Sequence, residues 1–239
     1  MLSGRTRRAW LLCVVFGVGV AAVFIWFAAA IPTQTCTGRQ PRGTSAFLAY
    51  QLARTTADVE AIFGAEGDPC RAAMITALNL ANTIDLVAFI AIYTGFAASF
   101  FLALKRSGGE GIARIGFVAV VFTLLCDVLE TSMQLYITSS LPGTVTSLVF
   151  LTIGNTGKLL GLAIVAVCAG AAMVARRGLL GRLTGAACLL SALMFVAGLN
   201  YSPVQPGISV GTTLLWLAMW LYAAVAAVRG AAAAGQASS

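Results

Sequence analysis

The chain has 239 residues, of which 59% are hydrophobic and only 10% are charged, and its mean hydropathy is +0.93. Charged residues make up about a quarter of an ordinary soluble domain, so this composition excludes a soluble protein and indicates a polytopic membrane protein. The formal net charge is +7, but the basic residues form small groups between hydrophobic runs. This pattern argues against the continuous basic face of a nucleic-acid-binding module.

Six hydrophobic segments are long enough to cross a bilayer, which needs about 20 residues of helix. They predict an all-α transmembrane bundle that forms one membrane domain, residues 1–239. The predicted helices cover residues 10–31, 72–104, 115–137, 145–175, 183–199 and 208–228, and the tail 230–239 is predicted to be disordered. The small residues 28–30 leave open a cleaved first segment. A retained helix is the preferred interpretation, because signal-peptide cores span only about 7 to 15 residues.

One long loop, residues 32–71, separates the first two predicted helices. Within it, apolar residues recur at steps of three and four between about 45 and 63. This spacing predicts an amphipathic helix that lies on the bundle or at the lipid interface.

The distribution of basic residues predicts the topology. Ten Lys and Arg residues fall on the side that carries both termini, whereas the opposite side has only the four in the long loop, matched by four acids. The positive-inside rule therefore predicts cytoplasmic termini and an extracytoplasmic loop. The predicted location is the plasma membrane, with the chain as a multi-pass protein. The ten residues are Arg5, Arg7, Arg8, Lys105, Arg106, Arg114, Arg176, Arg177, Arg182 and Arg229, and the four are Arg39, Arg42, Arg54 and Arg71.

Two of the six cysteines, Cys36 and Cys70, lie in the long loop. An oxidising compartment would favour a disulfide between them, and two free thiols are the alternative. The sequence has no Cys-x-x-Cys pair and no histidine, so it indicates no metal site and no cofactor.

Four ionisable residues interrupt the predicted membrane helices, namely Asp85, Asp127, Glu130 and Lys158. Such residues are rare in membrane spans and often functional. At 1.5 Å per residue, Asp85, Asp127 and Lys158 each lie about 15 to 20 Å from the extracytoplasmic ends of their helices. Glu130 is one turn shallower. Three consecutive helices thus bring their charges to one level near the middle of the membrane.

Further polar residues share helical faces with these charges, at about 100° per residue. On the third predicted helix, Gln134 continues the stripe of Asp127 and Glu130. The second helix carries a polar sector with Asp85 at its edge, and on the fourth helix a polar neighbour and two glycines accompany Lys158. The remaining members of this predicted polar cluster are Asn79, Asn82, Tyr93 and Asn155, with Gly154 and Gly161 as the glycines.

Three carboxyl groups facing one ammonium leave a surplus of negative charge in a medium that strongly disfavours it. Protonation, a bound cation or water must compensate the surplus. We expect Lys158 to pair with Asp127, which leaves Asp85 and Glu130 as the proton or cation carriers.

Two functional hypotheses follow. The first is a small proton- or cation-coupled transporter or sensor, and the second is a membrane scaffold or partner subunit in which the cluster only fixes helix packing. Intramembrane protease signatures and a serine nucleophile elbow are absent, and Gly154 to Lys158 lacks the full spacing of a phosphate-binding loop. No catalytic residue is therefore predicted. The predicted partners are the lipid bilayer and a proton or monovalent cation, with no nucleic acid.

Residues 45–160 resemble a group of uncharacterised bacterial polytopic membrane proteins. The likeness rests on Asp85 followed by Phe89 and Tyr93, on Asp127-x-x-Glu130, on Lys158 and on the loop segment 47–63. Thr131 stands where that group often has asparagine. The resemblance implies a bacterial membrane protein but no particular activity.

Overall fold

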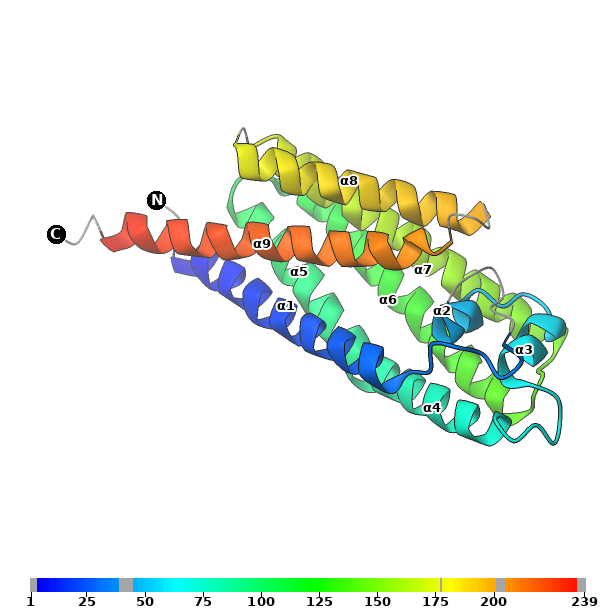
Figure 1. Ribbon diagram of the computed structural model, residues 1–239. Coiled ribbons are helices and arrows are strands. Elements are labelled where there is room, and N and C mark those ends of the chain that lie inside the picture. Colours follow the sequence, from blue (N-terminus) through cyan, green and yellow to red (C-terminus); the bar gives the residue numbers. More distant parts are fainter. Residues whose placement is uncertain (1–3, 39–44, 177, 201–204, 236–239) are drawn as a thin grey trace.

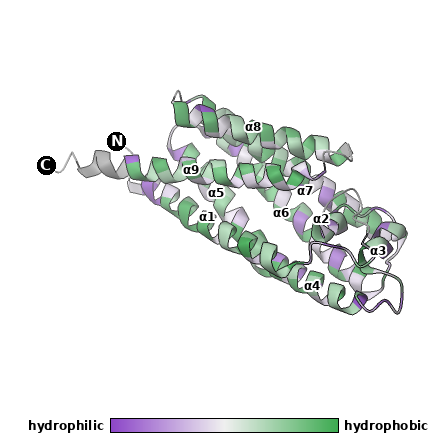
Figure 2. Ribbon diagram, viewed as in Figure 1, coloured by the Kyte–Doolittle hydropathy of each residue, from purple (hydrophilic) through white to green (hydrophobic). Residues whose placement is uncertain are grey.

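The computed structural model describes residues 4–38, 45–176, 178–200 and 205–235, and these residues form helices without any strand. Six helices are long and apolar enough to cross a membrane, which confirms the predicted fold class. They are α1 (Gly4–Ala30), the continuous segment α4 (Arg71–Ile84), η2 (Asp85–Phe89) and α5 (Ile90–Arg106), then α6 (Glu110–Ser139), α7 (Val145–Val174), α8 (Leu179–Asn200) and α9 (Gly207–Gly235). Hydrophobic residues dominate all six spans, as Figure 2 shows.

Several helices extend beyond their predicted limits. The second span has 36 residues, about 54 Å of helix against a hydrocarbon core of about 30 Å, so it projects from the membrane. Helix α9 continues to Gly235, so the prediction of a disordered tail over 230–239 is wrong for 230–235, and residues 236–239 lie outside the described residues. The alanines of this segment are strong helix formers, which hydropathy alone does not register.

The six spans form a closed ring in which each helix packs against the next along the chain, and α1 packs against α9 to close it. Short turns favour this order because they keep consecutive helices adjacent. The ends of α1 and α9 that carry the chain termini lie at the same end of the bundle (Figure 1). We call it the basic end, and the opposite end, which carries the 32–71 segment, the loop end. Arg39, Arg42 and Arg177, which entered the charge count above, lie outside the described residues.

Helices α6 and α7 approach each other closely along glycines of α7. A Cβ atom added at Gly154 would lie 2.7 Å from the backbone nitrogen of Glu130 and 2.9 Å from the carbonyl oxygen of Cys126. One added at Gly161 would clash with the Thr123 hydroxyl. Small residues therefore allow the two backbones to pack at this level, as in other membrane helix pairs.

The described residues of the loop segment, 32–38 and 45–71, fold into a cap over the loop end. It contains two helices, α2 (Ala46–Gln51) and α3 (Thr56–Phe63), so the prediction of one amphipathic helix over 45–63 is wrong. The break has a local cause: the Asp58 carboxylate accepts the backbone N–H groups of Arg54 and Thr55, and the Thr55 hydroxyl accepts the N–H of Asp58. This capping box starts a new helix at Thr56.

The apolar faces of α2 and α3 are buried against α4, α6 and α7, as the sequence periodicity implies. Tyr50, Ile62 and Phe63 are at most 1% exposed and pack with Leu78 and Ile137 of the spans. The cap is thus a second small core outside the main bundle, stabilised by apolar burial.

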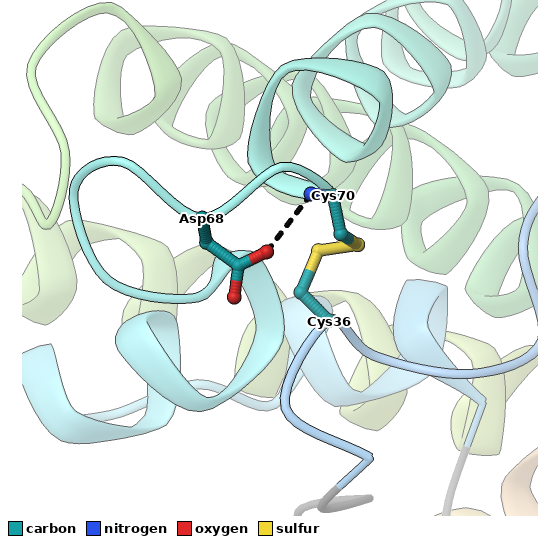
Figure 3. Close-up of side chains that lie close together, drawn as sticks. All are labelled: Cys36, Asp68 and Cys70. Atoms are coloured by element: carbon teal, nitrogen blue, oxygen red, sulfur yellow. Dashed lines mark hydrogen bonds between the residues drawn. A yellow bond between two sulfur atoms is a disulfide. The ribbon is translucent and has the colours of Figure 1, made fainter.

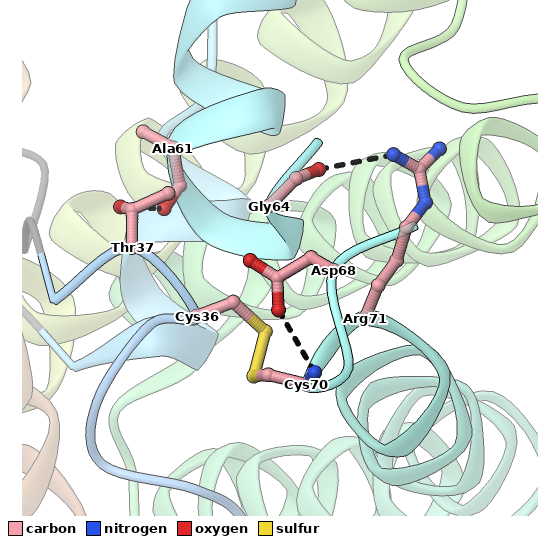
Figure 4. Close-up of a disulfide and its surroundings, with 7 residues drawn as sticks. All are labelled: Cys36, Thr37, Ala61, Gly64, Asp68, Cys70 and Arg71. Carbon is pink, nitrogen blue, oxygen red and sulfur yellow. Dashed lines mark hydrogen bonds between the residues drawn. A yellow bond between two sulfur atoms is a disulfide. The ribbon is translucent and has the colours of Figure 1, made fainter. Parts of the chain in front are cut away.

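A disulfide between Cys36 and Cys70 ties the two ends of the cap together, as Figure 3 shows. Around it, Asp68 accepts the Cys70 N–H at 2.8 Å and Arg71 donates to the Gly64 carbonyl at 3.0 Å (Figure 4). Thr37 donates to the Ala61 carbonyl at 2.6 Å. These contacts hold the start of the segment, the end of α3 and the start of α4 in one unit.

The disulfide can be tested by counting thiols. In denatured protein that has not been reduced, a maleimide reagent should modify four of the six cysteines, namely Cys13, Cys126, Cys168 and Cys188. After reduction it should modify all six, as read by intact mass. Because the bridge closes a segment of 34 residues, Cys36→Ser with Cys70→Ser should destabilise the cap by about 3 to 4 kcal/mol. Six modified cysteines before reduction would contradict the assignment.

The close packing of α6 and α7 predicts a cost for any side chain at position 154. Gly154→Ala should destabilise the protein by about 1 to 3 kcal/mol, because its Cβ would meet backbone atoms that cannot rotate away. Thermal unfolding in detergent measures the effect. Gly111→Ala is the matched control, since no atom lies within 4 Å of its added Cβ. Equal melting temperatures for the two variants would refute the close approach.

Candidate functional site

Lys158 of α7 lies between two carboxylates of α6. Its Nζ atom is 3.0 Å from Oδ1 of Asp127 and 2.7 Å from Oε2 of Glu130. The carboxylates are three residues apart, so both project from one face of α6. All three side chains are buried, with 11% of Lys158, 4% of Asp127 and none of Glu130 exposed. We call these three residues the triad.

The triad corrects one part of the sequence analysis. Lys158 does contact Asp127, but Glu130, which was expected to remain unpaired as a proton or cation carrier, is held by the same ammonium. The spacing of one helical turn and the length of the lysine side chain allow a single amine to bridge both acids. Lys158 therefore pairs with both acids and not with Asp127 alone.

Neighbouring polar groups complete the triad. Tyr93 of α5 donates its hydroxyl hydrogen to Oδ2 of Asp127 at 2.7 Å, and Asn155 donates to Oε2 of Glu130 at 3.4 Å. Oε1 of Glu130 is buried and has no hydrogen-bond partner among the described residues. A buried oxygen without a donor is costly when charged, which makes this position suited to a proton or a water molecule.

Asp85 has a different environment from the triad. It is 5% exposed, and its Oδ2 accepts a hydrogen bond from Thr131 at 2.8 Å. It makes no ion pair with any basic group of the described chain. Of the four buried ionisable residues, it is the one that lacks a direct partner of opposite charge.

A π-helical turn places Asp85 at this site. The backbone N–H of Ile90 bonds to the carbonyl of Asp85, five residues earlier, so the turn η2 holds more residues than an α-turn. The extra residue in the turn changes the angular position of the residues that follow it. Asp85 and Tyr93 therefore both point toward α6, where they contact Thr131 and Asp127. Regular 100° steps put Asp85 only at the edge of the polar sector. The sequence contains no clear signal for this wide turn.

The remaining predicted polar residues lie between the triad and the loop end, on the facing helices α4 and α6. Thr138 donates to the side chain of Asn79 at 2.7 Å. Asn82 and Gln134 are buried, and both side-chain polar atoms of Asn82 and Nε2 of Gln134 lack partners among the described residues. Polar atoms of this kind commonly hold buried water.

Tyr50 of the cap closes this polar region, and the sequence analysis did not identify it. Its hydroxyl donates to the backbone carbonyl of Gln134 at 2.5 Å. Burial raises the pKa of the Tyr50 phenol well above its usual value. The cap thereby contacts the polar interior directly.

A cavity of about 320 Å³ reaches the charged cluster from the loop end. Asp85, Asp127 and Lys158 form its buried floor, whereas Ser45 and Ser209 at its rim are exposed. Its walls come from α1, α2, η2, α5, α7 and α9. The wall and rim residues include Phe24, Phe27, Ala28, Ile31, Phe47, Leu48, Gln51, Phe89, Tyr93, Leu159, Leu162, Ile208, Thr212, Thr213 and Trp216.

The sequence analysis missed the contribution of α1 and α9 to the site. These helices carry no buried charge, and their site residues are aromatic, aliphatic, serine or threonine. Only the closure of the ring brings them to the acids of the middle helices. In the sequence of α9, only its serine and threonine residues indicate a helix face that borders a polar cavity.

A second group of acid and sulfur ligands lies in the cap. Side-chain atoms of Cys36, Asp68 and Cys70 lie within 4.8 Å of one another. Both sulfur atoms are joined in the disulfide and so are not thiolates, and one oxygen of Asp68 accepts the Cys70 N–H. These groups are therefore close because of the disulfide and the hydrogen bond from the Cys70 N–H to Asp68.

Comparison with known proteins gives no matching family model, no matching curated protein and no matching solved structure. The resemblance of residues 45–160 to bacterial membrane proteins thus stays a prediction, and the function is inferred from the site itself.

The triad predicts a strong dependence of stability on Lys158. Lys158→Met should destabilise the protein by about 3 to 5 kcal/mol, because it leaves two buried carboxylates without a cation. Adding Glu130→Gln to this variant should recover part of the loss. Thermal unfolding in detergent compares the three proteins.

A matched control for this experiment is Lys105→Met. Lys105 pairs with Glu110 at 3.6 Å, but both side chains are more than half exposed, so its loss should change stability by less than about 1 kcal/mol. If Lys158→Met and Lys105→Met melted alike, the triad would not contribute as the geometry indicates.

Proposed function

We propose that the protein is a small membrane transporter or sensor that exchanges protons or cations at its buried carboxyl cluster. The observation that carries this proposal is the cavity whose floor is Asp85, Asp127 and Lys158. A cluster that served only to fix helix packing would need no open space beside it. An ionisable residue inside a membrane span that borders a cavity is typical of ion and proton pathways.

The charges of the cluster suggest a division of roles. Lys158 neutralises one of the two acids of the triad, and the arrangement of short contacts holds α6 to α7. Asp85 is left with a hydrogen bond from Thr131 and an opening to the cavity. We therefore assign the exchanged proton or cation to Asp85.

The groups that face Asp85 make its charge state sensitive to the cavity. Asp127 and Glu130 carry the same sign of charge as an ionised Asp85, whereas Lys158 carries the opposite sign. The ammonium is already shared by two other carboxylates. A cation that enters the cavity and a proton on Asp85 would thus be alternative ways to balance the same charge.

We further propose that the termini are cytoplasmic and the membrane is the bacterial plasma membrane. The ends of α1 and α9 nearest the chain termini lie at the basic end of the bundle (Figure 1), and positive charge favours the cytoplasmic side. The disulfide lies at the opposite end, where an oxidising compartment would maintain it. The cavity then opens toward the outside.

A scaffold or partner subunit is the second candidate, and the triad is the observation that favours it. A lysine that bridges two acids across closely packed helices is well suited to fixing which helices pair. In that case Asp85 and its cavity would have no role in exchange. The two candidates differ in what they predict for Asp85.

Proton flux into liposomes loaded with a pH-sensitive dye distinguishes these candidates. A transporter should give flux that Asp85→Asn lowers at least about tenfold, since the variant removes the exchangeable carboxyl. Glu110→Gln is the control, because Glu110 is an exposed acid at the basic end and its loss should leave flux unchanged.

The same proteins separate a sensor from a scaffold. A sensor should show no flux but a change in tryptophan fluorescence with pH that Asp85→Asn removes, since Trp216 lines the cavity. If flux is absent and fluorescence responds equally in both proteins, only the scaffold remains.

A further inference from the structure

The wall of the cavity is a continuous series of aromatic rings. Phe89 lies at its centre, with ring centroids 5.3 Å from Phe24, 5.6 Å from Phe27 and 5.4 Å from Tyr93. Phe27 continues to Phe47 at 5.6 Å, and Tyr93 continues to Trp216 at 5.8 Å. All six residues line the cavity.

This aromatic wall stands directly beside acidic groups. Asp85 is the first residue of the η2 turn and Phe89 is its last, and Tyr93 donates its hydroxyl hydrogen to Asp127. The cavity floor thus combines two carboxyl groups with one ammonium that is already paired twice. Charge complementarity therefore favours a positively charged occupant.

Aromatic faces attract cations that shed their water easily, and cages of several rings recognise quaternary ammonium groups in particular. A small hydrated metal ion would prefer oxygen ligands on all sides, which this mostly aromatic and aliphatic wall does not supply. The volume of about 320 Å³ lies at the lower end for small-molecule sites.

We propose that the cavity binds a small organic monocation, an ammonium group with apolar substituents, whose charge lies between Asp85 and the aromatic wall. The exposed rim residues Ala28 of α1 and Ser209 of α9 mark the entrance. This inference rests on the proposed exchange at Asp85 and names the species that replaces the proton. One cation that enters releases one proton, so the charge of the site does not change.

Binding of benzyltrimethylammonium to the purified full-length protein tests the inference by calorimetry. The neutral carbon isostere, neopentylbenzene, has the same shape without the charge and should bind much more weakly. Asp85→Asn should weaken binding of the cation at least about tenfold, because it removes the opposing charge. Phe89→Leu should weaken it about fivefold, whereas Phe89→Tyr should retain it.

Phe150→Leu is the matched control for the aromatic variants, since Phe150 is 46% exposed and outside the cavity. Its affinity for the cation should equal that of the unchanged protein. A thermal melt of each variant shows whether a loss of binding reflects loss of the fold, and Asp85→Asn keeps the inference testable if Phe89→Leu does not fold.

Three results would overturn the inference. The first is equal affinity of the protein for the charged and the neutral compound. The second is equal affinity of the unchanged protein and a folded Asp85→Asn variant for the cation. The third is displacement of the cation by sodium or potassium chloride at equal concentration. Proton flux in a protein that does not bind the organic cation would remove this inference and leave the proposed function in place. Binding of the cation without flux or a fluorescence response would establish the cation site but remove the proposed exchange of protons at Asp85.

Discussion

The placement of one ammonium between two carboxylates in the middle of the bundle constrains much of the structure. A lysine and two acids are expensive to keep away from water unless they are paired at short distance. The 2.7 Å and 3.0 Å contacts of Lys158 require α6 and α7 to be close neighbours at this level. Gly154, one turn before the lysine, lies against the backbone of Glu130 and allows that approach. The close packing of α6 and α7 thus also brings the lysine and the two acids within ion-pair distance.

The other helices serve this pair in different ways. Helix α5 supplies the Tyr93 hydroxyl to Asp127, and η2 supplies Asp85, which is hydrogen-bonded to α6 through Thr131. The cap covers the same helices at the loop end, where Tyr50 reaches the backbone of Gln134. Helices α1 and α9 contribute no charge and instead enclose the space beside the acids. The charged groups therefore come from the middle helices, and α1 and α9 supply uncharged walls of the cavity.

Sequence reasoning predicted the features that depend on regular helix geometry. The common depth of the buried charges follows from the rise per residue, and the six spans follow from hydropathy. The break in the loop helix also had a signal, because Thr55 and Asp58 have the spacing of a capping box. The apolar periodicity continues across the break, however, and it predicted one continuous helix in spite of the capping-box spacing.

Other features were beyond that reasoning for physical reasons. The wide turn at Asp85 changes the angular register, and its energy depends on tertiary packing and not on local propensity. The double pairing of Lys158 depends on how closely two backbones approach, which helical angles do not give. The aromatic wall joins residues from opposite ends of the chain, so no local pattern relates Phe27 to Trp216.

The contact that closes the ring has a consequence for biosynthesis. Trp220 of α9 donates to the backbone carbonyl of Val14 in α1, two residues separated by 206 positions. Helices α6 and α7 precede α9 along the chain, so they leave the ribosome earlier and can pair first. During synthesis the acids would acquire their lysine while the lipid-facing side of the site is still open. The cavity would therefore be enclosed only after α9 has packed against α1.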